Sequence, residues 1–376
     1  MKKIIHIIPN DKKFVNIIIR LFENNKNTDN TFIVVSKILQ KNSNNIFYKK
    51  HKELINKEFI DNTIKGNDII IFHSLLASGA KLISKIDFKI KIIWASWGGD
   101  FYHHHPMLKA NILEPKTKAL EQRLEPFFKE KIIRPLLKVI YPQRFSYYWQ
   151  KKAIKKITYI APVIYDDYEL IKKYYKAPHL KYLDFSVGNL EDDLLTGINI
   201  NAKVGNNILL GNSSSFTNNH IEAINILSKI ELKNKKVIIP LSYGNKKLKK
   251  YLIKYGTENL KSNFNPLTDF LAPNEYHKLL MSCGFVIMNH KRQQGMGNIV
   301  IAMYLGAKIF LNNQNPVYTY FKRLGAYVFL IDEIIEKKEK ALVALTQEQI
   351  NKNREILDKT LSRKVVNGYV QKIAEL

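Results

Sequence analysis

The sequence predicts an α/β protein with two domains, each built on a parallel β-sheet. Three observations lead to this fold class. Short, continuous apolar segments alternate with amphipathic ones, which is the pattern of parallel strands covered by helices on both faces. The alternation restarts near residue 207, after a stretch at 184–206 that is rich in Gly, Asn and Asp. The length of 376 residues also exceeds one ordinary domain.

The first domain is expected to span residues 1–190. Its predicted strands are the apolar runs at 4–8, 31–35, 68–72, 90–94 and 158–162, and its predicted helices include 14–22, 75–83 and 166–175. The carboxyl ends of parallel strands meet at one sheet edge, where α/β proteins bind ligands. At that edge we expect His73 and the segment Trp97-Gly98-Gly99-Asp100. Asp100 could orient or deprotonate a hydroxyl group, or it could cap a turn, and His73 could instead be a satisfied, half-buried histidine.

The chain is strongly basic, with 60 Lys and Arg against 33 Asp and Glu and a formal net charge of +27. Such a balance indicates an acidic partner. Residues 116–156 concentrate the charge, with 12 Lys or Arg against three Glu, among aromatics that include Phe127, Phe128 and Trp149. This mixture suits an anionic membrane surface, on which the segment would lie without crossing it. Nucleic-acid binding and a solvated helical face are the alternatives.

Several classes of protein are disfavoured. No segment reaches the ~20 apolar residues of a membrane span, and the start of the chain is too short in apolar residues for a signal peptide. The single cysteine, Cys283, excludes an internal disulfide and is expected to be a small buried residue. The tract His103-His104-His105 lacks the spacing of a metal site, so we expect no metal and no cofactor. A location on the cytoplasmic face of a membrane fits these features.

The second domain is expected over residues 191–345, followed by closing helices at 346–376. Its predicted strands are 207–210, 237–239, 284–288 and 308–311, with helices opening near 218, 245, 274 and 299. Small, polar loops follow three of the strands, at 211–215, 240–244 and 289–298. Their convergence at one sheet edge predicts a grip on a nucleotide diphosphate.

The loop at 289–298 carries the clearest chemistry. It joins the end of a strand to the start of a helix, where free N–H groups and the helix dipole favour an anion. Gly295 and Gly297 allow close approach of the backbone, and Arg292 adds a fixed positive charge suited to phosphate. An ordinary strand–helix turn with a polar rim is the alternative.

The ordered segments Gly211-Asn212-Ser213, 218–223, 240–244 and 292–297 resemble the bacterial family of TDP-4-acetamido-4,6-dideoxygalactose transferases. Those enzymes add a fucosamine-type sugar to a lipid-linked intermediate of enterobacterial common antigen. The resemblance covers mainly residues 207–311. It implies a GT-B glycosyltransferase with two Rossmann-like domains facing across a cleft, the acceptor on the first and the TDP-sugar on the second. It also implies peripheral attachment to the bacterial inner membrane and a polyprenyl-diphosphate-linked acceptor, with no nucleic-acid partner.

Carried over by position, the resemblance assigns two sets of contacts. The acceptor set is His73, Trp97, Gly98, Gly99 and Asp100. The donor set is Gly211, Asn212, Ser213, Ser242, Tyr243, Tyr276, Arg292, Gln293, Gln294, Gly295, Gly297 and Asn298. Within these sets Arg292 would stabilise the leaving diphosphate, and Asp100 would be the base of an inverting reaction. The sequence departs from the family at 214–216 and at Asn298, which leaves the donor sugar open. A GT-B enzyme with another donor, such as a UDP-N-acetylhexosamine, and a non-enzymatic nucleic-acid-binding protein are the alternatives.

Overall fold

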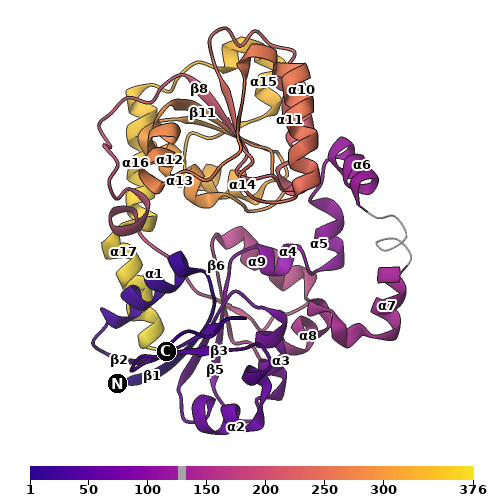
Figure 1. The fold of residues 1–376 in the computed structure, drawn as a ribbon. Helices are drawn as coiled ribbons and strands as arrows, with labels where there is room; N and C mark the ends of the chain where they lie inside the picture. Colours follow the sequence, from indigo (N-terminus) through magenta and orange to yellow (C-terminus); the bar gives the residue numbers. More distant parts are fainter. Residues whose placement is uncertain (126–132) are drawn as a thin grey trace. The chain divides into compact units, whose positions relative to one another are not determined.

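A computed structural model describes residues 1–125 and 133–376 of the chain (Figure 1). The chain forms two compact units. Unit 1 contains residues 1–109, 133–189 and 361–376, and unit 2 contains residues 110–132 and 190–360. Two stretches therefore group differently from the expected boundaries: residues 110–132 belong with the second unit, and residues 361–376 with the first.

Unit 1 is a parallel, seven-stranded sheet with the strand order β3-β2-β1-β4-β5-β6-β7. Its strands are β1 Lys2–Pro9, β2 Thr28–Val35, β3 Ile46–Lys49, β4 Ile69–His73, β5 Lys91–Ser96, β6 Tyr159–Pro162 and β7 Lys181–Tyr182. Its helices are α1 Lys12–Glu23, α2 Lys57–Phe59, α3 Ala77–Lys85, α4 Gly99–Tyr102, α5 Pro106–Asn111, α7 Arg134–Ile140, α8 Ser146–Ala153, α9 Tyr165–Tyr174 and α17 Arg363–Ala374.

Unit 2 is a parallel, six-stranded sheet with the order β10-β9-β8-β11-β12-β13. Its strands are β8 Asn207–Leu210, β9 Val237–Pro240, β10 Phe264–Leu267, β11 Cys283–Met288, β12 Lys308–Leu311 and β13 Phe329–Leu330. Its helices are α6 Pro115–Leu124, α10 His220–Leu227, α11 Lys246–Leu260, α12 Pro273–Met281, α13 Met296–Leu305, α14 Pro316–Arg323, α15 Asp332–Lys337 and α16 Gln347–Leu361.

The apolar runs of the sequence form the central strands because both faces of each sheet are covered. In β4 and β11 every residue is buried, which requires continuous rather than alternating apolar sequence. Cys283 is buried at the start of β11, as expected from the sequence. The parallel α/β architecture of both units is confirmed.

Helices from distant parts of the chain complete both cores. Val366 and Val370 of α17 join the core of unit 1, where they pack with residues of β1 and α1. Leu120 of α6 joins the core of unit 2, together with residues of α10 and α11. The first turn of α6 is fixed by the Glu222 carboxylate of α10, which accepts the N–H and the hydroxyl of Thr117 at 2.8 and 2.6 Å. Residues 115–124 are therefore an integral part of unit 2.

Candidate active site

The strand order of unit 2 reverses between β8 and β11, the central pair of its sheet. Chain progress runs outward from β8 through β9 to β10 on one side, and from β11 through β12 to β13 on the other. Such a switch point opens a crevice outside the carboxyl ends of the two central strands, and α/β proteins bind ligands there. The loops 211–215 and 289–298 follow these two strands. The fold therefore brings the two predicted loops together.

Helix α13 supplies an anion site at this point. Gly295 precedes the helix in the left-handed conformation, with φ of 68°, which glycine adopts without strain. The helix is apolar on all sides and mostly buried, so its axis is held firmly within the unit. The N–H groups of its first turn have no acceptor within the helix. They and the helix dipole favour a negative charge beside Gly295 and Gly297.

Direct hydrogen bonds join the three predicted loops. The backbone N–H of Ser214 donates to the carbonyl oxygen of Tyr243 at 2.9 Å, and its hydroxyl donates to the same oxygen at 2.7 Å. The Nε2 of Gln294 donates to Oδ1 of Asn212 at 2.9 Å, and Thr217 Oγ1 donates to Oε1 of Gln294 at 2.7 Å. The loops after β8, β9 and β11 therefore form one connected surface.

Asn218 holds the first loop in place from below. Its side chain is fully buried, and its Oδ1 accepts the N–H of Asn212 and the Nε2–H of His290, both at 2.8 Å. Its Nδ2 donates to Oγ of Ser213 at 3.3 Å and to the carbonyl oxygen of Ser215 at 3.2 Å. One amide side chain thus fixes the loop that would face a phosphate group.

Gly211 lies against the same group of side chains. A Cβ atom there would come within 2.6 Å of Asn218 Oδ1 and 2.7 Å of His220 Nε2, and φ is already 69°. Only glycine fits this position, because both the backbone conformation and the available space exclude a side chain.

Asn219 holds the segment that precedes α6 in the same way. Its Oδ1 accepts the N–H of Glu114 at 2.8 Å, and its Nδ2 donates to the carbonyl oxygen of Asn289 at 2.9 Å. Nδ2 of Asn312 donates both to Oδ1 of Asn289 at 2.8 Å and to the Glu114 carboxylate at 2.9 Å. Lys291 lies 4.0 Å from that carboxylate. The adjacent residues 218 and 219 therefore pair with the adjacent residues 290 and 289.

Two buried histidines lie behind the loops. Burial lowers the pKa of His220 to about 3. Burial, followed by the charges of Arg292 and His220, holds the pKa of His290 well below its ordinary value. Both rings are therefore neutral near pH 7, where they supply shape and hydrogen bonds and carry no charge. His220 Nε2 and His290 Nδ1 have no hydrogen-bond partner among the described residues.

The remaining predicted donor residues lie in the same part of unit 2. Arg292 is largely buried and donates through Nη1 to the carbonyl oxygen of Gln293 at 3.0 Å. The side-chain Oε1 of Gln293 is buried without a partner in the described part of the chain. Asn298 Nδ2 donates to the hydroxyl of Tyr276 at 2.8 Å, which ties α12 to the first turn of α13. Ser242 is half-buried just before Tyr243.

In unit 1, Asp100 does not project from the sheet edge as expected. It is 5% exposed and turned inward. Its Oδ2 accepts Nε1–H of Trp94 at 2.6 Å and the N–H of Leu75 at 2.8 Å, and its Oδ1 accepts the N–H of Trp97 at 3.1 Å. Burial raises the pKa of Asp100, against the opposing effect of these hydrogen bonds. The carboxylate joins the loops that follow β4 and β5.

His73 is also turned inward, and its side chain is fully buried. Its Nε2 lies 3.1 Å from Nδ1 of His6, whose Nε2 lies 3.2 Å from Oδ1 of Asn30. Burial lowers the pKa of His73 well below its ordinary value. Trp97 is half-buried and packs on Phe14, with ring centroids 4.8 Å apart, and Gly98 precedes α4 with φ of 87°. These predicted acceptor residues therefore lie near one another, but the His73 and Asp100 side chains make internal contacts.

Sequence reasoning assigned no site role to four residues of this arrangement, Asn218, Asn219, Glu114 and Asn312, although the first two belong to the segment 218–223 that carries the family resemblance. Asn218 and Asn219 stand between a predicted loop and a predicted helix, and their turn geometry was the available signal. Glu114 was not detectable, because nothing in a local pattern shows that residues from the first half of the chain complete the second unit.

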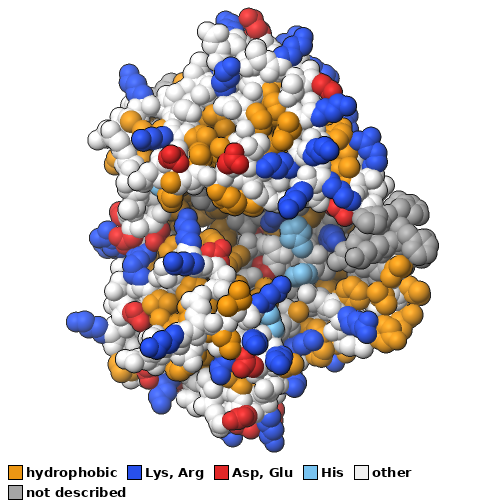
Figure 2. Space-filling view, viewed as in Figure 1, with side chains coloured by type: hydrophobic (Ala, Val, Ile, Leu, Met, Phe, Trp, Pro, Cys, Tyr) orange, Lys and Arg blue, Asp and Glu red, His pale blue; other side chains and the backbone are white. Residues whose placement is uncertain are grey.

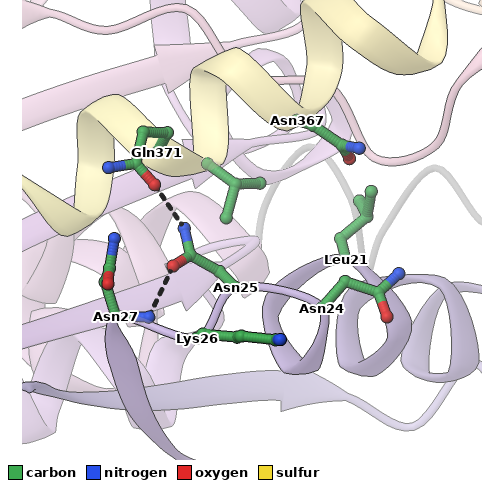
Figure 3. A pocket seen from close by; sticks show the side chains of 8 residues that line it. Leu21, Asn24, Asn25, Lys26, Asn27, Asn367 and Gln371 are labelled. Atoms are coloured by element: carbon green, nitrogen blue, oxygen red, sulfur yellow. Dashed lines mark hydrogen bonds between the residues drawn. The ribbon is translucent and has the colours of Figure 1, made fainter.

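Two cavities of unit 1 lie at the opposite, amino edge of its sheet. One, of about 200 Å³, is formed by residues 24–27 and α17; there Nδ2 of Asn25 donates to Oε1 of Gln371 at 3.2 Å (Figure 3). The other, of about 730 Å³, lies at the starts of β1, β4 and β5 and is lined by residues that include Lys2, Asp68 and Lys91. Neither lies at the carboxyl edge, where ligands of this architecture bind.

Comparison with known proteins assigns the chain to a family. The sequence model of glycosyl transferase group 56, described as 4-alpha-L-fucosyltransferase, matches residues 141–373, more than half of the chain. The chain belongs to this family. It is a glycosyltransferase of the fucosyltransferase type, and the family implies a nucleotide-sugar donor and a glycan acceptor.

Solved structures that resemble the chain show the same fold. The N-terminal domain of trehalose-6-phosphate phosphatase from Candida albicans gives a TM-score of 0.66 at 10% identity, over 100% of this chain and 96% of that one. A glycosyltransferase from Rickettsia africae gives 0.57 at 10% identity, over 100% and 98%. WaaG, a glycosyltransferase of lipopolysaccharide biosynthesis, gives 0.56 at 11% identity, over 99% and 98%. The two Rossmann-like units are those of a GT-B glycosyltransferase.

Two further observations describe the molecule without deciding its chemistry. Among the residues that the structure describes, no group of three or more His, Cys, Asp or Glu is placed to hold a metal ion. None of the described helices is both long enough and apolar enough to cross a bilayer.

Proposed function

We propose that this glycosyltransferase moves a 4-acetamido-4,6-dideoxyhexose from a TDP-sugar to a saccharide linked to undecaprenyl diphosphate, in the synthesis of a surface polysaccharide. The observation that carries the proposal is the joined surface of the loops 211–215, 240–244 and 289–298 at the switch point of unit 2. The resemblance of these loops to the TDP-fucosamine transferases supports the choice of donor, and the family match supports a fucose-like sugar.

In the proposed reaction the bond between C1 of the sugar and the diphosphate oxygen breaks, and a bond from an acceptor hydroxyl oxygen to C1 forms. Negative charge builds on the leaving diphosphate. The N–H groups of the first turn of α13 and the guanidinium of Arg292 are proposed to stabilise it, because donors and charges fixed before the reaction cost no reorganisation when the charge develops. Gln293 and Gln294 are proposed to contact the sugar. The acceptor proton passes to a base. The sequence predicted Asp100 for this role, but the inward hydrogen bonds of its carboxylate favour a supporting role in unit 1 instead.

The donor assignment is tested by calorimetry with TDP and by a screen of nucleotide sugars against lipid-linked acceptors, with product masses determined. We expect TDP binding that Arg292→Ala weakens by about 10- to 150-fold, which corresponds to the loss of one hydrogen bond to a charged group at about 1.5–3 kcal/mol. Arg354→Ala is the matched control, because Arg354 also bonds backbone carbonyl groups of unit 2, at Tyr304 and Ile200. Preference for UDP over TDP would replace the donor, and salt-sensitive nucleic-acid binding without nucleotide binding would overturn the proposal.

We also propose that the enzyme attaches peripherally to an anionic membrane through α7 and α8. Hydrophobic side chains gather over α7 (Figure 2). Leu136 is 58% exposed, Val139 80% and Ile140 53%, although such side chains are normally buried. Exposed basic residues follow, among them Arg144, Lys151 and Lys152. Apolar side chains beside cations suit the boundary between acyl chains and anionic headgroups.

The aromatic residue Trp149 of the same segment makes more contacts within the protein than the sequence indicated. Nε1–H of Trp149 donates to the carbonyl oxygen of Gln143 at 2.7 Å, and the ammonium groups of Lys81 and Lys152 lie over its ring. Phe127 and Phe128 lie outside the described residues. The proposed contact therefore rests on the aliphatic residues of α7.

Flotation with vesicles that contain anionic lipid tests this attachment. Val139→Asp is expected to release the protein, because it places a charge among the exposed aliphatic side chains. Val343→Asp is the control, since Val343 is 62% exposed in unit 2. Equal flotation of both variants would show that α7 does not contact the membrane. If the wild-type protein does not float with the vesicles, the proposed membrane attachment is wrong.

A further inference from the structure

Two exposed aromatic side chains stand together beside the donor loops. Tyr243, after β9, is 49% exposed, and Phe270, after β10, is 77% exposed. Their ring planes are nearly parallel, at 15°, with centroids 6.0 Å apart. A single exposed aromatic residue needs no explanation, but two aligned rings leave an open aromatic face at the sheet edge where ligands of this architecture bind.

The position of Tyr243 relative to the proposed diphosphate site is fixed by its backbone. Ser214 bonds the Tyr243 carbonyl oxygen twice, at 2.9 and 2.7 Å, and the next glycine packs against Ser214 so closely that a Cβ there would lie 2.6 Å from the Ser214 carbonyl oxygen. The phenol oxygen of Tyr243 lies 3.4 Å from Nδ2 of Asn212. Tyr243 and the anion-binding loop are therefore parts of one connected surface, and Phe270 packs on the ring of Tyr243.

The order of the strands arranges the chemistry along the edge. Phe270 follows β10, Tyr243 follows β9, Asn212 follows β8, and the loop with Arg292 follows β11. Adjacent strands lie about 5 Å apart, so Tyr243 and Phe270 stand roughly 5 and 10 Å along the edge from the loop with Asn212, and roughly 10 and 15 Å from the loop with Arg292. A nucleoside diphosphate spans a comparable length from its flat base to its phosphate groups.

We infer that Tyr243 and Phe270 form the platform on which the nucleobase of the donor stacks. This inference rests on the proposed function and adds the residues that recognise the base. A base offers a flat π-face, and stacking on an aromatic side chain tolerates any base, so the platform supplies affinity for nucleotides over bare diphosphate. Phe270 has no hydrogen-bonding group, so stacking is the contact it can offer.

The test compares three ligands on the full-length protein by calorimetry: TDP, inorganic pyrophosphate, and the 5′-diphosphate of deoxyribose, which has no base. Phe270→Ala is expected to weaken TDP binding by about 5- to 150-fold, the range of one base–aromatic stack. Binding of the two ligands without a base is expected to stay unchanged. Phe270→Trp is expected to bind TDP as tightly as wild type, and Phe270→Leu with an affinity between those of wild type and Phe270→Ala. Ile335→Ala is the matched control, because Ile335 is 56% exposed elsewhere in unit 2.

The outcomes separate the inference from the proposed function. Equal TDP affinity of Phe270→Ala and wild type overturns the platform and leaves the donor assignment standing. Equal weakening of all three ligands also overturns it, because Phe270 would then support the anion site. If wild type binds neither TDP nor any other nucleoside diphosphate, the proposed function itself fails. Because Phe270 is mostly exposed, its substitution is not expected to unfold the unit.

Discussion

The two units share a strand order around their switch points, yet they use the carboxyl edges of their sheets differently. In unit 2 some residues at this edge support the loops and others stay exposed. Asn218 is buried and bonded to loop 211–215, while Tyr243 and Gly297 are exposed. In unit 1 the corresponding Asp100 and His73 are turned inward and hydrogen-bonded. Topology therefore gives each unit a switch point, and the loops determine whether polar groups remain for a ligand.

Gly211→Ala should give the largest effect, since it acts where loop and support meet. A methyl group would press on Asn218 and His220, and the left-handed backbone adds about 1–2 kcal/mol of strain. We expect the binding free energy of TDP, measured by calorimetry, to weaken by about 3 kcal/mol, which is about 100-fold in Kd. Gly325→Ala is the control, because Gly325 has φ of 81° with no atom within 4 Å of a Cβ. If both variants lose TDP binding equally, strain alone is responsible and the contact with Asn218 is unimportant.

Asp100→Asn separates support from catalysis in unit 1. The amide cannot accept all three hydrogen bonds, and bonds to a charged group are worth about 1.5–3 kcal/mol. We expect urea unfolding to show about 2 kcal/mol lower stability, with TDP affinity unchanged. Turnover that falls at least 100-fold at unchanged stability would instead make Asp100 the base that the sequence predicted.

The loops of unit 2 were predictable because strand ends can be recognised locally. The run 207–210 coincides with β8, and the loops after β8 and β11 were located correctly. The direction of individual side chains was not predictable. Whether Asp100 faces solvent depends on Trp94 and Leu75, which meet it only after β4 and β5 pair, and the position of Glu114 depends on a segment that joins the other unit.

Asn218→Ala and Asn30→Ala make the comparison between units at matched positions, because each asparagine is buried and bonded to a buried histidine, His290 or His6. Each loss leaves buried polar groups without a partner, at about 2 kcal/mol of stability. Only Asn218→Ala is expected to weaken TDP binding as well, by about 10-fold, since Asn30 supports no donor loop. Equal TDP affinities for the two variants would show that loop 211–215 holds its shape without Asn218.

The buried histidines give the smallest effect, which should appear in both units on acidification. Burial lowers the pKa of His6 to about 3 in the folded protein, against 6.5 as its ordinary value. The unfolded chain therefore binds the proton first as pH falls through 6.5, and folding stability declines by about 1.4 kcal/mol per pH unit for each such ring until about pH 3. His6→Gln should remove one such contribution. Between pH 7.0 and 5.5, the free energy of unfolding in urea should fall by about 1 kcal/mol less for this variant than for wild type. His220→Gln should give the same difference in unit 2, because burial also lowers the pKa of His220 to about 3. If the variants and wild type lose the same free energy of unfolding, these histidines accept protons within the folded units, and their cores do not require neutral rings.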